Sequence, residues 1–432
     1  MNPLIVGLLG TILMLVLMFL GVPVGFAMGL VGFFGIWYFT NIFAAMSQAA
    51  VLPYSLIANY DYCVLPLFLL MANICFYTGM GTKLFDIAYK WTGRLPGGLA
   101  AAAIGACAMF GAVSASVIAT TLTIGLVSIP EMRKYKYDGA LAAACVASAS
   151  VLGILIPPSG ILIIYGIITE QSIGDLFVSG IIPGIMLTIM FIVQVVVMGL
   201  LKPDMAPAGP STSFKEKFRS FGSAIEVILL IIIVLAGLII GWYTPTEAGA
   251  IGAFGAIVFS LIRRTLKLDN FKKAAIETIS GSGMIYILLI GAFLFNTFLT
   301  LSTIPQELAS IVAGLNLPRL LTMVLILLVY IILGTALDTM PLVLLTVPVF
   351  FPLIVNLGYD PLWFGVIIVL VSGMGNITPP VGITVFVAAN IAKDVPMGKI
   401  FNQTWTFLAT QVVFALILML VPEIVTFLPK LI

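Results

Sequence analysis

The chain of 432 residues is 62% hydrophobic and 8% charged, and its mean hydropathy is +1.23. A water-soluble domain of this length cannot bury so much apolar surface, so we expect an all-α polytopic membrane protein. Histidine is absent, which excludes a His-ligated haem or metal and a His proton relay. The formal net charge of +2 gives no indication of nucleic-acid binding, and nothing in the sequence calls for an organic cofactor.

Apolar runs of about 17 to 25 residues are typical of membrane-spanning helices. The amino-terminal run has no basic region before it and no small-residue cleavage site, so we expect it to be retained as a span. Between the second and third spans, residues 43–62 are only moderately apolar and predict an arm at the outer interface. In chain order, ten spans are expected at 3–20, 22–40, 64–80, 138–168, 180–201, 223–241, 247–262, 274–300, 360–391 and 403–422.

The basic residues define an orientation. If the amino terminus is outside, all Lys and Arg residues except Arg319 and Lys430 fall in segments on the inner side. Retention of positive charge on the cytoplasmic side is the main determinant of membrane topology. We therefore expect both termini to face the outside of the cytoplasmic membrane.

One apolar run, between Arg94 and Arg133, is too long for a single ordinary span. A single crossing would place one of the two basic clusters at its ends on the wrong side of the membrane. We therefore expect a re-entrant helical hairpin over 96–130 that enters from the cytoplasm and turns within Gly111 to Ser116, where the run breaks.

A second run, over 318–352, breaks within Gly334 to Pro341 and has acidic residues at its ends, with Arg319 as its one basic residue. We expect this hairpin to enter from the outer side.

Two Pro-Pro pairs interrupt apolar runs in the same way. The sequence GILIPPSG runs from Gly153 to Gly160, and GNITPPVG runs from Gly375 to Gly382. A proline removes a backbone donor and collides with the preceding turn, so we expect broken helices over 138–168 and 360–391. Carbonyl groups freed at membrane depth are tolerated where they line a cavity or bind something, which indicates a transport site.

A shift of 222 residues superimposes the two Pro-Pro breaks and predicts an internal repeat. Each copy, 1–201 and 223–432, would hold five spans and one hairpin, with 202–222 as a cytoplasmic connector. An odd number of crossings inverts the second copy, in agreement with the opposite polarity of the hairpins. The same shift pairs Pro96 with Pro318, Pro130 with Pro352, Tyr137 with Tyr359, Asp138 with Asp360 and Ser150 with Ser372.

Five motifs in this order, GAVSASVIAT, IPPSG, YTPTEAGAIGA, LDTMP and ITPPVG, resemble the large membrane subunit of the tripartite ATP-independent periplasmic (TRAP) transporters. The resemblance implies a fold of the ion-transporter superfamily and an elevator-type, sodium-driven import of organic acids across the bacterial inner membrane. It also implies two partners, a small four-helix membrane subunit on a separate polypeptide and a periplasmic substrate-binding protein.

The resemblance further implies at least two bound sodium ions, each held where a hairpin tip meets a break. The first ion would lie among Gly111, Ser114, Gly153, Ile156 and Pro158, and the second among Gly334, Gly375, Thr378 and Val381.

Asp338 is the one acidic residue that we place at membrane depth, where a charge is costly and therefore often functional. It could neutralise sodium or gate the site, or it could cap a helix that starts at Thr339. Four further residues, Ser116, Ser159, Asn376 and Thr384, are candidates to face the same cavity and contact substrate, although each could instead bond to its local backbone. Lys and Arg are absent from the expected spans, so a carboxylate would have to meet sodium ions and the positive ends of helices.

Three alternatives remain open. A stand-alone sodium- or proton-coupled carrier of the same architecture would need no partner subunits. A channel would need a continuous polar pore, whereas the polar residues gather at two breaks. A membrane enzyme would need catalytic groups, and the expected spans hold no His, metal cluster or paired carboxylates.

Overall fold

The structure is a computed structural model that describes residues 2–209, 213–314 and 317–431. Every regular element in these ranges is helical, which confirms the expected all-α class. The helices are α1 (Pro3–Phe19), α2 (Val24–Phe39), α3 (Ile42–Ile57), η1 (Tyr60–Cys63), α4 (Val64–Tyr77), α5 (Met80–Thr92), α6 (Gly98–Ser114), α7 (Val117–Lys134), α8 (Gly139–Ala149), α9 (Leu152–Leu155), α10 (Gly160–Thr169), α11 (Ile173–Leu201), α12 (Phe214–Ile240), α13 (Pro245–Ile262), α14 (Leu268–Leu301), α15 (Ile304–Gly314), α16 (Arg319–Gly334), α17 (Thr339–Asn356), α18 (Pro361–Gly375), α19 (Ile383–Ile391), α20 (Met397–Leu420) and α21 (Glu423–Leu431).

Seven helical segments of the described chain are long and apolar enough to cross a membrane. They include α11, α14 and α20, which were expected as spans, and also α17, which was expected as one arm of a hairpin. The first two expected spans are shorter helices of 17 and 16 residues. The chain is therefore a multi-pass membrane protein whose spans vary in length.

Side-chain caps explain several helix ends. Asp138 accepts a hydrogen bond from the amide of Leu141 at the start of α8, and Asp360 does the same for Leu362 at the start of α18. These two aspartates are 222 residues apart, so the register found in the sequence pairs residues with the same local role. Such caps satisfy amides that have no partner inside the helix.

Two capping boxes set the starts of α12 and α13. At α13, Thr244 and Glu247 cap each other's amides, so Glu247 serves a helix start. At α12, Ser213 and Glu216 form the same arrangement, so the helix begins inside the range 202–222 that was expected as a connector. Residues 210–212 of that connector lie outside the described residues.

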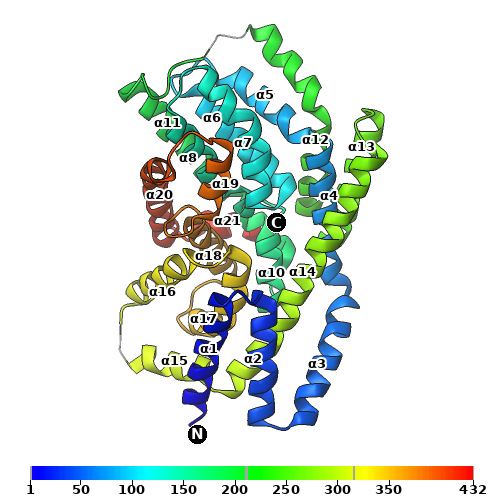
Figure 1. Ribbon diagram of the computed structural model, residues 1–432, viewed down its shortest axis with the longest axis vertical. Helices are drawn as coiled ribbons and strands as arrows, with labels where there is room; N and C mark the ends of the chain where they lie inside the picture. The colour runs from blue at the N-terminus through cyan, green and yellow to red at the C-terminus, as the bar shows by residue number, and fades with distance from the viewer. Residues whose placement is uncertain (1, 210–212, 315–316, 432) are drawn as a thin grey trace.

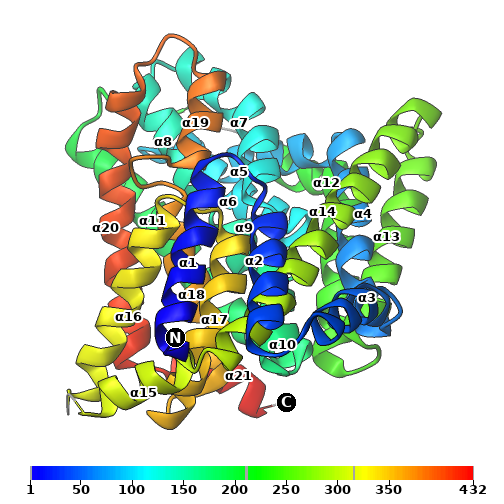
Figure 2. The same cartoon turned by 60° about the horizontal axis from the view of Figure 1, so that its bottom comes forward.

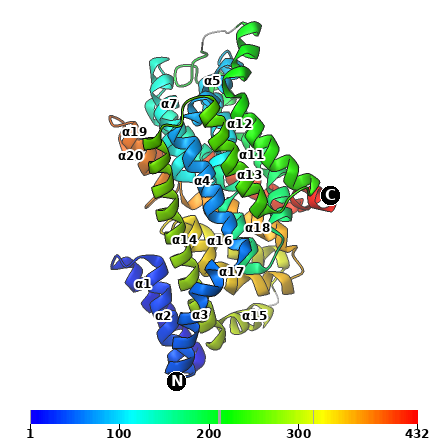
Figure 3. The ribbon, with the colours of Figure 1, turned by 90° about the vertical axis from the view of Figure 1, so that its right-hand side faces the viewer.

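One group of helices packs around the long helix α14. Its 34 residues would span about 51 Å, well above the ~30 Å thickness of a bilayer core. Helices α2, α3 and α4 pack along it, and α13 packs on α4 (Figure 3). Close packing needs small residues here, because a Cβ at Gly32 would lie 2.5 Å from the carbonyl carbon of Leu294. We call α2, α3, α4, α12, α13 and α14 the scaffold group.

A second group contains both hairpins and both broken helices. Helix α6 packs on α7, α8 and α9, while α18 packs on α16, α17 and α20. The two groups lie on opposite sides of the molecule, with α13 and α20 far apart (Figures 1 and 2). We call α6 to α10 together with α16 to α20 the hairpin group.

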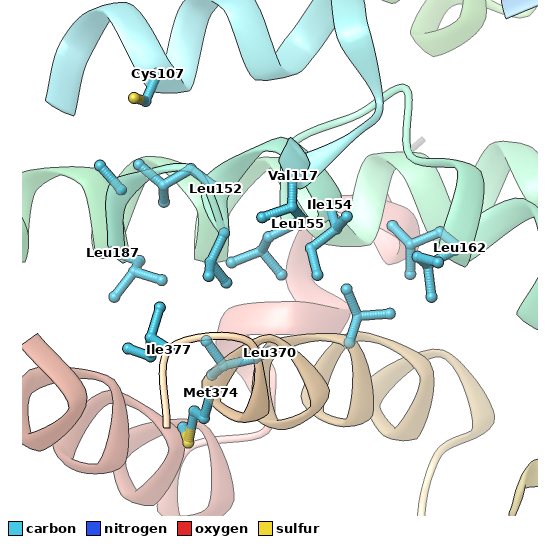
Figure 4. Packing of buried hydrophobic residues seen from close by; sticks show 14 of the residues in the cluster. Cys107, Val117, Leu152, Ile154, Leu155, Leu162, Leu187, Leu370, Met374 and Ile377 are labelled. Carbon is cyan, nitrogen blue, oxygen red and sulfur yellow. The ribbon is translucent and has the colours of Figure 1, made fainter. Parts of the chain in front are cut away.

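The two broken helices pack directly on each other inside the hairpin group. Leu152 and Leu155 of α9 lie beside Leu370 and Met374 of α18, and all four are fully buried (Figure 4). A Cβ at Gly373 would lie 2.3 Å from Cγ1 of Val151, so this contact requires glycine. The first break is therefore seated against the second broken helix.

Helix α5 connects the groups, since it packs on α6 and on α12. Lys83 of α5 donates to Glu226 of α12 at 2.5 Å, and Arg263 at the end of α13 donates to the same carboxylate at 2.9 Å. Glu226 is only 4% exposed, so this buried charge is balanced by two cations. The three-way ion pair fixes α5 to the scaffold group.

Candidate functional site

The first hairpin turns over two residues between α6 and α7. Ala115 adopts a left-handed conformation with φ of 49°, and its amide bonds to the carbonyl of Gly111. Ser116 then caps α7, because its hydroxyl accepts a hydrogen bond from the amide of Ala119 at 3.3 Å. The turn lies within Gly111 to Ser116, where the sequence places the break.

The second hairpin turns between α16 and α17. Asp338 caps α17 by accepting a hydrogen bond from the amide of Thr339 at 2.8 Å. Asp338 and Ser116 are 222 residues apart, so both turns end in the same kind of cap. Asp338 also lines the cavity described below, so both readings of this residue, a cap and a charge in a cavity, agree with its position.

Each hairpin touches its own broken helix through a pair of glycines. A Cβ at Gly111 would lie 2.5 Å from Cα of Gly153. A Cβ at Gly375 would lie 2.3 Å from the carbonyl oxygen of Gly334. These four glycines were expected near sodium, and they bring the backbone of each tip against the backbone near each break.

The Pro-Pro pairs lie where the sequence places them, between α9 and α10 and between α18 and α19. Both Pro157-Pro158 and Pro379-Pro380 are joined by cis peptide bonds. At the first break Ser159 caps α10, whereas at the second break Gly382 begins α19 in a left-handed conformation with φ of 56°. The two breaks thus share their prolines and differ in the residues that restart the helix.

A cavity of about 670 Å³ lies between the two groups of helices. Both hairpin tips line it, the first through Ser114 to Ile118 and the second through Ala336 to Pro341. The first broken helix lines it near Gly160, and the scaffold group lines it through α4 and α14. The two hairpin tips, which lie far apart in the sequence, therefore line one cavity.

Three helix starts reach the cavity wall, at Val117 of α7, Gly160 of α10 and Thr339 of α17. The first amides of a helix have no partner inside the helix, and this end carries a partial positive charge. The side-chain caps accept from Ala119 and Leu162, in the third positions of α7 and α10, which leaves the two earlier amides of each helix. The starts of α7 and α10 are therefore suited to an anion, whereas the start of α17 is already met by the Asp338 carboxylate.

Oxygen atoms gather at the first glycine contact. The hydroxyl of Ser114 lies 2.7 Å from that of Thr120, and Thr120 donates to the carbonyl of Ser116 at 2.8 Å. Thr120 is fully buried and adjoins Gly153, since a Cβ added at Gly153 would lie 3.0 Å from the hydroxyl of Thr120. Thr120 was not among the expected site residues, although its position one helical turn after Ser116 on the same face is a signal for it.

At the second glycine contact the oxygen atoms come from the broken helix. Asn376 donates from Nδ2 to the hydroxyl of Thr339 at 2.9 Å, while its buried Oδ1 has no hydrogen-bond partner in the described chain. The hydroxyl of Ser372 is likewise buried without a partner there, and its carbonyl lies near Gly334. Ser372 was not expected as a site residue, although it pairs with Ser150 in the 222-residue register.

Three of the four substrate candidates do not line the cavity. Ser116 lines it, but Ser159, Asn376 and Thr384 are at most 2% exposed and do not. Ser159 donates to the carbonyl of Ile154, and Thr384 donates to the carbonyl of Asn376 at 2.9 Å. The expectation that all four face one cavity is corrected. Asn376 and Thr384 belong to the second broken helix, which does not line the cavity, and Ser159 is turned into the first break, where it bonds to Ile154.

The remaining expected ligands lie beside the breaks. Ile156 covers Gly184 of α11, and Pro158 is buried at the first break. Thr378 donates its hydroxyl to the carbonyl of Met374 at 2.7 Å, and Val381 is 38% exposed. These residues could therefore ligate an ion through their backbone carbonyls more readily than through their side chains.

Glu226 was also missed as a buried acid within the expected span 223–241. The carboxylate of Glu226 pairs with two cations, Lys83 and Arg263, and Glu226 does not line the cavity. Asp338 is therefore the one titratable side chain among the described residues of the cavity wall.

Comparison with known proteins agrees with this architecture. Residues 11–424 match the family described as the tripartite ATP-independent periplasmic transporter, DctM component. The C4-dicarboxylate TRAP transporter large permease protein DctM of Pseudomonas aeruginosa is 34% identical over 373 residues, which are 86% of this chain and 87% of that protein. The sialic acid TRAP transporter large permease protein SiaM of Vibrio cholerae is 29% identical, and the match covers 96% of each chain.

Two further comparisons concern a fused relative and a solved structure. The isethionate TRAP transporter permease protein DctMQ of Oleidesulfovibrio alaskensis is 30% identical over 94% of this chain and 64% of that protein. The YdaH transporter of Alcanivorax borkumensis has a TM-score of 0.64 at 14% identity, covering 89% of each chain, which shows a shared fold. The match to the family over nearly its full length, supported by these large permeases, shows that the chain belongs to the DctM component family of TRAP transporters.

Proposed function

We propose that the chain is the large permease subunit of a sodium-coupled secondary importer of an organic acid. The observation that carries the proposal is the cavity to which both hairpin tips and the first broken helix contribute. The starts of α7 and α10 would bind the carboxylate, with Ser116 within reach as a hydroxyl donor.

Sodium would bind at the two glycine contacts beside this cavity. A sodium ion needs several oxygen ligands and, unlike a transition metal, needs neither His nor Cys; the described chain contains no cluster of three His, Cys, Asp or Glu residues. Ser114, Thr120 and the Ser116 carbonyl would serve the first ion. The unpaired Asn376 Oδ1 and Ser372 hydroxyl, with the carbonyl of Gly334, would serve the second.

The mechanism proposed is an elevator in which the hairpin group moves against the scaffold group. Direct packing of the two broken helices supports movement of the hairpin group as one unit. The shared caps Asp138 and Asp360 support two repeats. Inversion of the second copy would follow from an odd number of crossings in each. Sodium bound at the glycine contacts would hold each tip against its break and so couple ion binding to closure.

The partners proposed are a small four-helix membrane subunit and a periplasmic substrate-binding protein. The names of the family and of the fused DctMQ relative support a multi-component system. Both termini lie toward the same end of the molecule in Figure 2, in keeping with a bacterial inner-membrane protein whose termini are both periplasmic.

The test is uptake into proteoliposomes that contain the chain and its small subunit, with the binding protein outside. Radiolabelled succinate, isethionate and sialic acid, chosen from the acids that the relatives are named for, would be offered with an inward sodium gradient, and again with choline in place of sodium. The proposal predicts accumulation of at least one of these acids, and only with sodium and the binding protein. Accumulation of equal size in choline would contradict it, and accumulation in sodium without the binding protein would favour a stand-alone carrier of the same architecture.

A further inference from the structure

Basic and apolar side chains share one surface where the ends of α5 and α11 meet the start of α12, toward the top of Figure 1. Nζ of Lys217 in α12 lies 5.8 Å from the centre of the ring of Trp91 in α5. A Cβ at Gly199 of α11 would lie 2.5 Å from the amide nitrogen of Gly97, so α11 reaches the loop that follows α5. We call this surface the arm junction, and we define it by Trp91, Arg94, Lys202, Phe214, Lys215 and Lys217.

The arm junction keeps positive charge that the chain does not neutralise. Residues 80–95 and 202–219 together hold seven basic and three acidic residues. One of these acids, Asp86, is already paired with Lys90. The exposed cations that form no ion pair within the described chain include Arg94, Lys202 and Lys215. A ligand of this surface must therefore be anionic.

Apolar side chains stand among these cations. The exposed fraction is 39% for Trp91, 44% for Leu95 beside Arg94, and 72% for Phe214. Cations interleaved with exposed aromatic side chains are typical of helices that lie in the headgroup region of a bilayer. Tryptophan in particular concentrates at membrane–water interfaces. The anion that fits this surface therefore also has an apolar part.

The equivalent arm of the second repeat lacks this charge. The 222-residue register pairs α5 with residues 302–314, which contain α15 and hold Glu307 as their one charged residue. The expected orientation places α5 on the cytoplasmic side and α15 on the outer side. The cytoplasmic leaflet is the one that carries a negative surface potential from its anionic lipids. The basic arm is thus the arm expected to face anionic lipid.

We propose that the arm junction binds an anionic phospholipid of the cytoplasmic leaflet, with the phosphate among the unpaired cations and the acyl chains beside Trp91 and Phe214. Charge complementarity carries the choice of ligand, since each Lys or Arg near an anionic membrane surface strengthens attachment about fivefold. A bound lipid would hold the end of α5 against the start of α12, where the arm meets the scaffold group. The inference uses neither sodium ions nor an organic acid, so it goes beyond the proposed function and does not depend on either.

The test is quenching of tryptophan fluorescence by phospholipids with brominated acyl chains. The purified full chain in neutral detergent is used alone and in complex with its small subunit. Bromine quenches tryptophan on contact, and subtraction of the variant Trp91→Phe isolates the signal of Trp91 from those of the other tryptophans. Phosphatidylglycerol and phosphatidylcholine are the two probes, because their acyl chains match while their net charges differ. We expect phosphatidylglycerol to quench Trp91 half-maximally at a concentration at least fivefold lower than phosphatidylcholine does.

A pair of substitutions tests the cations themselves. Arg94→Gln combined with Lys215→Gln should bring the two half-maximal concentrations within about twofold of each other. The thermal unfolding midpoint without added lipid should not change, because neither cation forms an ion pair within the described chain. The matched control is Lys393→Gln combined with Lys399→Gln, which removes two exposed cations beside α19 and α20 and should leave the preference intact.

Three results would overturn the inference. Equal quenching of Trp91 by both lipids would show that the arm junction does not select an anion. A loss of preference in the control pair as large as in the tested pair would assign the preference to the general positive charge on this side of the protein. Failure of both lipids to quench Trp91 once the small subunit is bound would show that the subunit, and not lipid, covers the arm junction.

Discussion

The two hairpin tips meet their broken helices through the same backbone contact but with different polar groups. At the first contact the hydroxyls belong to the hairpin, in Ser114 and Thr120. The 222-residue register places Ala336 and Leu342 at the equivalent positions of the second hairpin. There the polar group is instead Asn376 of the broken helix, which stands where the first copy has Ile154.

Symmetry of the backbone therefore does not require symmetry of the ligands. Both copies retain the glycine pair, the aspartate cap and the Pro-Pro break, because these set chain direction and close approach. The side chains that complete each oxygen cluster differ between the copies, since Thr120 has Leu342 as its equivalent and Asn376 has Ile154. The two sodium sites that we propose should therefore differ in affinity and respond to different substitutions.

The largest expected effect is on the second glycine contact. Gly375→Ala would place a methyl group 2.3 Å from the backbone of Gly334, whereas Gly334→Ala would place one at an ordinary 3.4 Å from Cα of Gly375. Overpacking against rigid backbone costs about 1 to 3 kcal/mol, so Gly375→Ala should abolish sodium-dependent uptake while Gly334→Ala retains most of it.

Proteoliposome uptake at equal protein content measures this difference. Gly283→Ala in α14 is the control, because no atom lies within 4 Å of a Cβ there. Equal loss in Gly375→Ala and Gly334→Ala would show that the contact is not as close as described.

The next effect separates the two oxygen clusters. Thr120→Val removes a hydroxyl without changing side-chain shape, and Ser372→Ala removes one from the second cluster. Loss of an oxygen ligand worth about 1 to 2 kcal/mol should raise the sodium concentration for half-maximal uptake by roughly 5- to 30-fold. Ser128→Ala is the control, since the Ser128 hydroxyl bonds to the carbonyl of Ile124 within its own helix. Unchanged sodium dependence in Thr120→Val would remove that residue from the site.

The sequence predicts the elements on which this comparison rests to within a few residues. Glycine and proline act through the local backbone, so both hairpin turns and both breaks could be found from the chain alone. Thr120, Ser372 and the pairing of Asn376 with Thr339 depend on which helix faces lie together, and that is a property of tertiary packing. For the same reason the sequence could not show that Asn376 and Thr384 do not line the cavity.

A smaller effect concerns the scaffold and leaves the site intact. Glu226→Gln removes the charge shared by Lys83 and Arg263, whose side chains are 27% and 41% exposed and can be partly hydrated instead. The expected loss is about 1 to 3 kcal/mol of stability, seen as a lower thermal unfolding midpoint with unchanged sodium dependence. Asp86→Asn, which breaks the exposed pair with Lys90, should shift the midpoint far less. A midpoint unaffected by Glu226→Gln would show that this buried pair does not stabilise the protein.

The smallest effect is a dependence on pH at the end of the first hairpin. Arg133 bonds to both carboxylate oxygens of Asp394, after α19, and this hydrogen bonding holds the pKa of Asp394 below its usual value. The pKa of Asp394 is thus lower in the folded protein than in the unfolded chain. The ion pair therefore stabilises the fold at pH values above the usual pKa of an aspartate, and this stabilisation is lost as the pH falls through the lowered pKa. Asp394→Asn should remove this slight acid sensitivity, measured by thermal unfolding between neutral and acidic pH. An identical pH profile for the variant would exclude the ion pair as its source.

The most direct measurement is the number of sodium ions held by the purified complex, obtained by equilibrium binding of radioactive sodium to the unaltered chain and to two variants. We expect at least two bound ions, with the affinity for one of them lowered roughly 5- to 30-fold in Thr120→Val and the affinity for a different one lowered in Ser372→Ala. In the double variant both affinities should be lowered. A single bound ion in the unaltered chain, or weakening of the same ion in both single variants, would contradict two separate sodium sites.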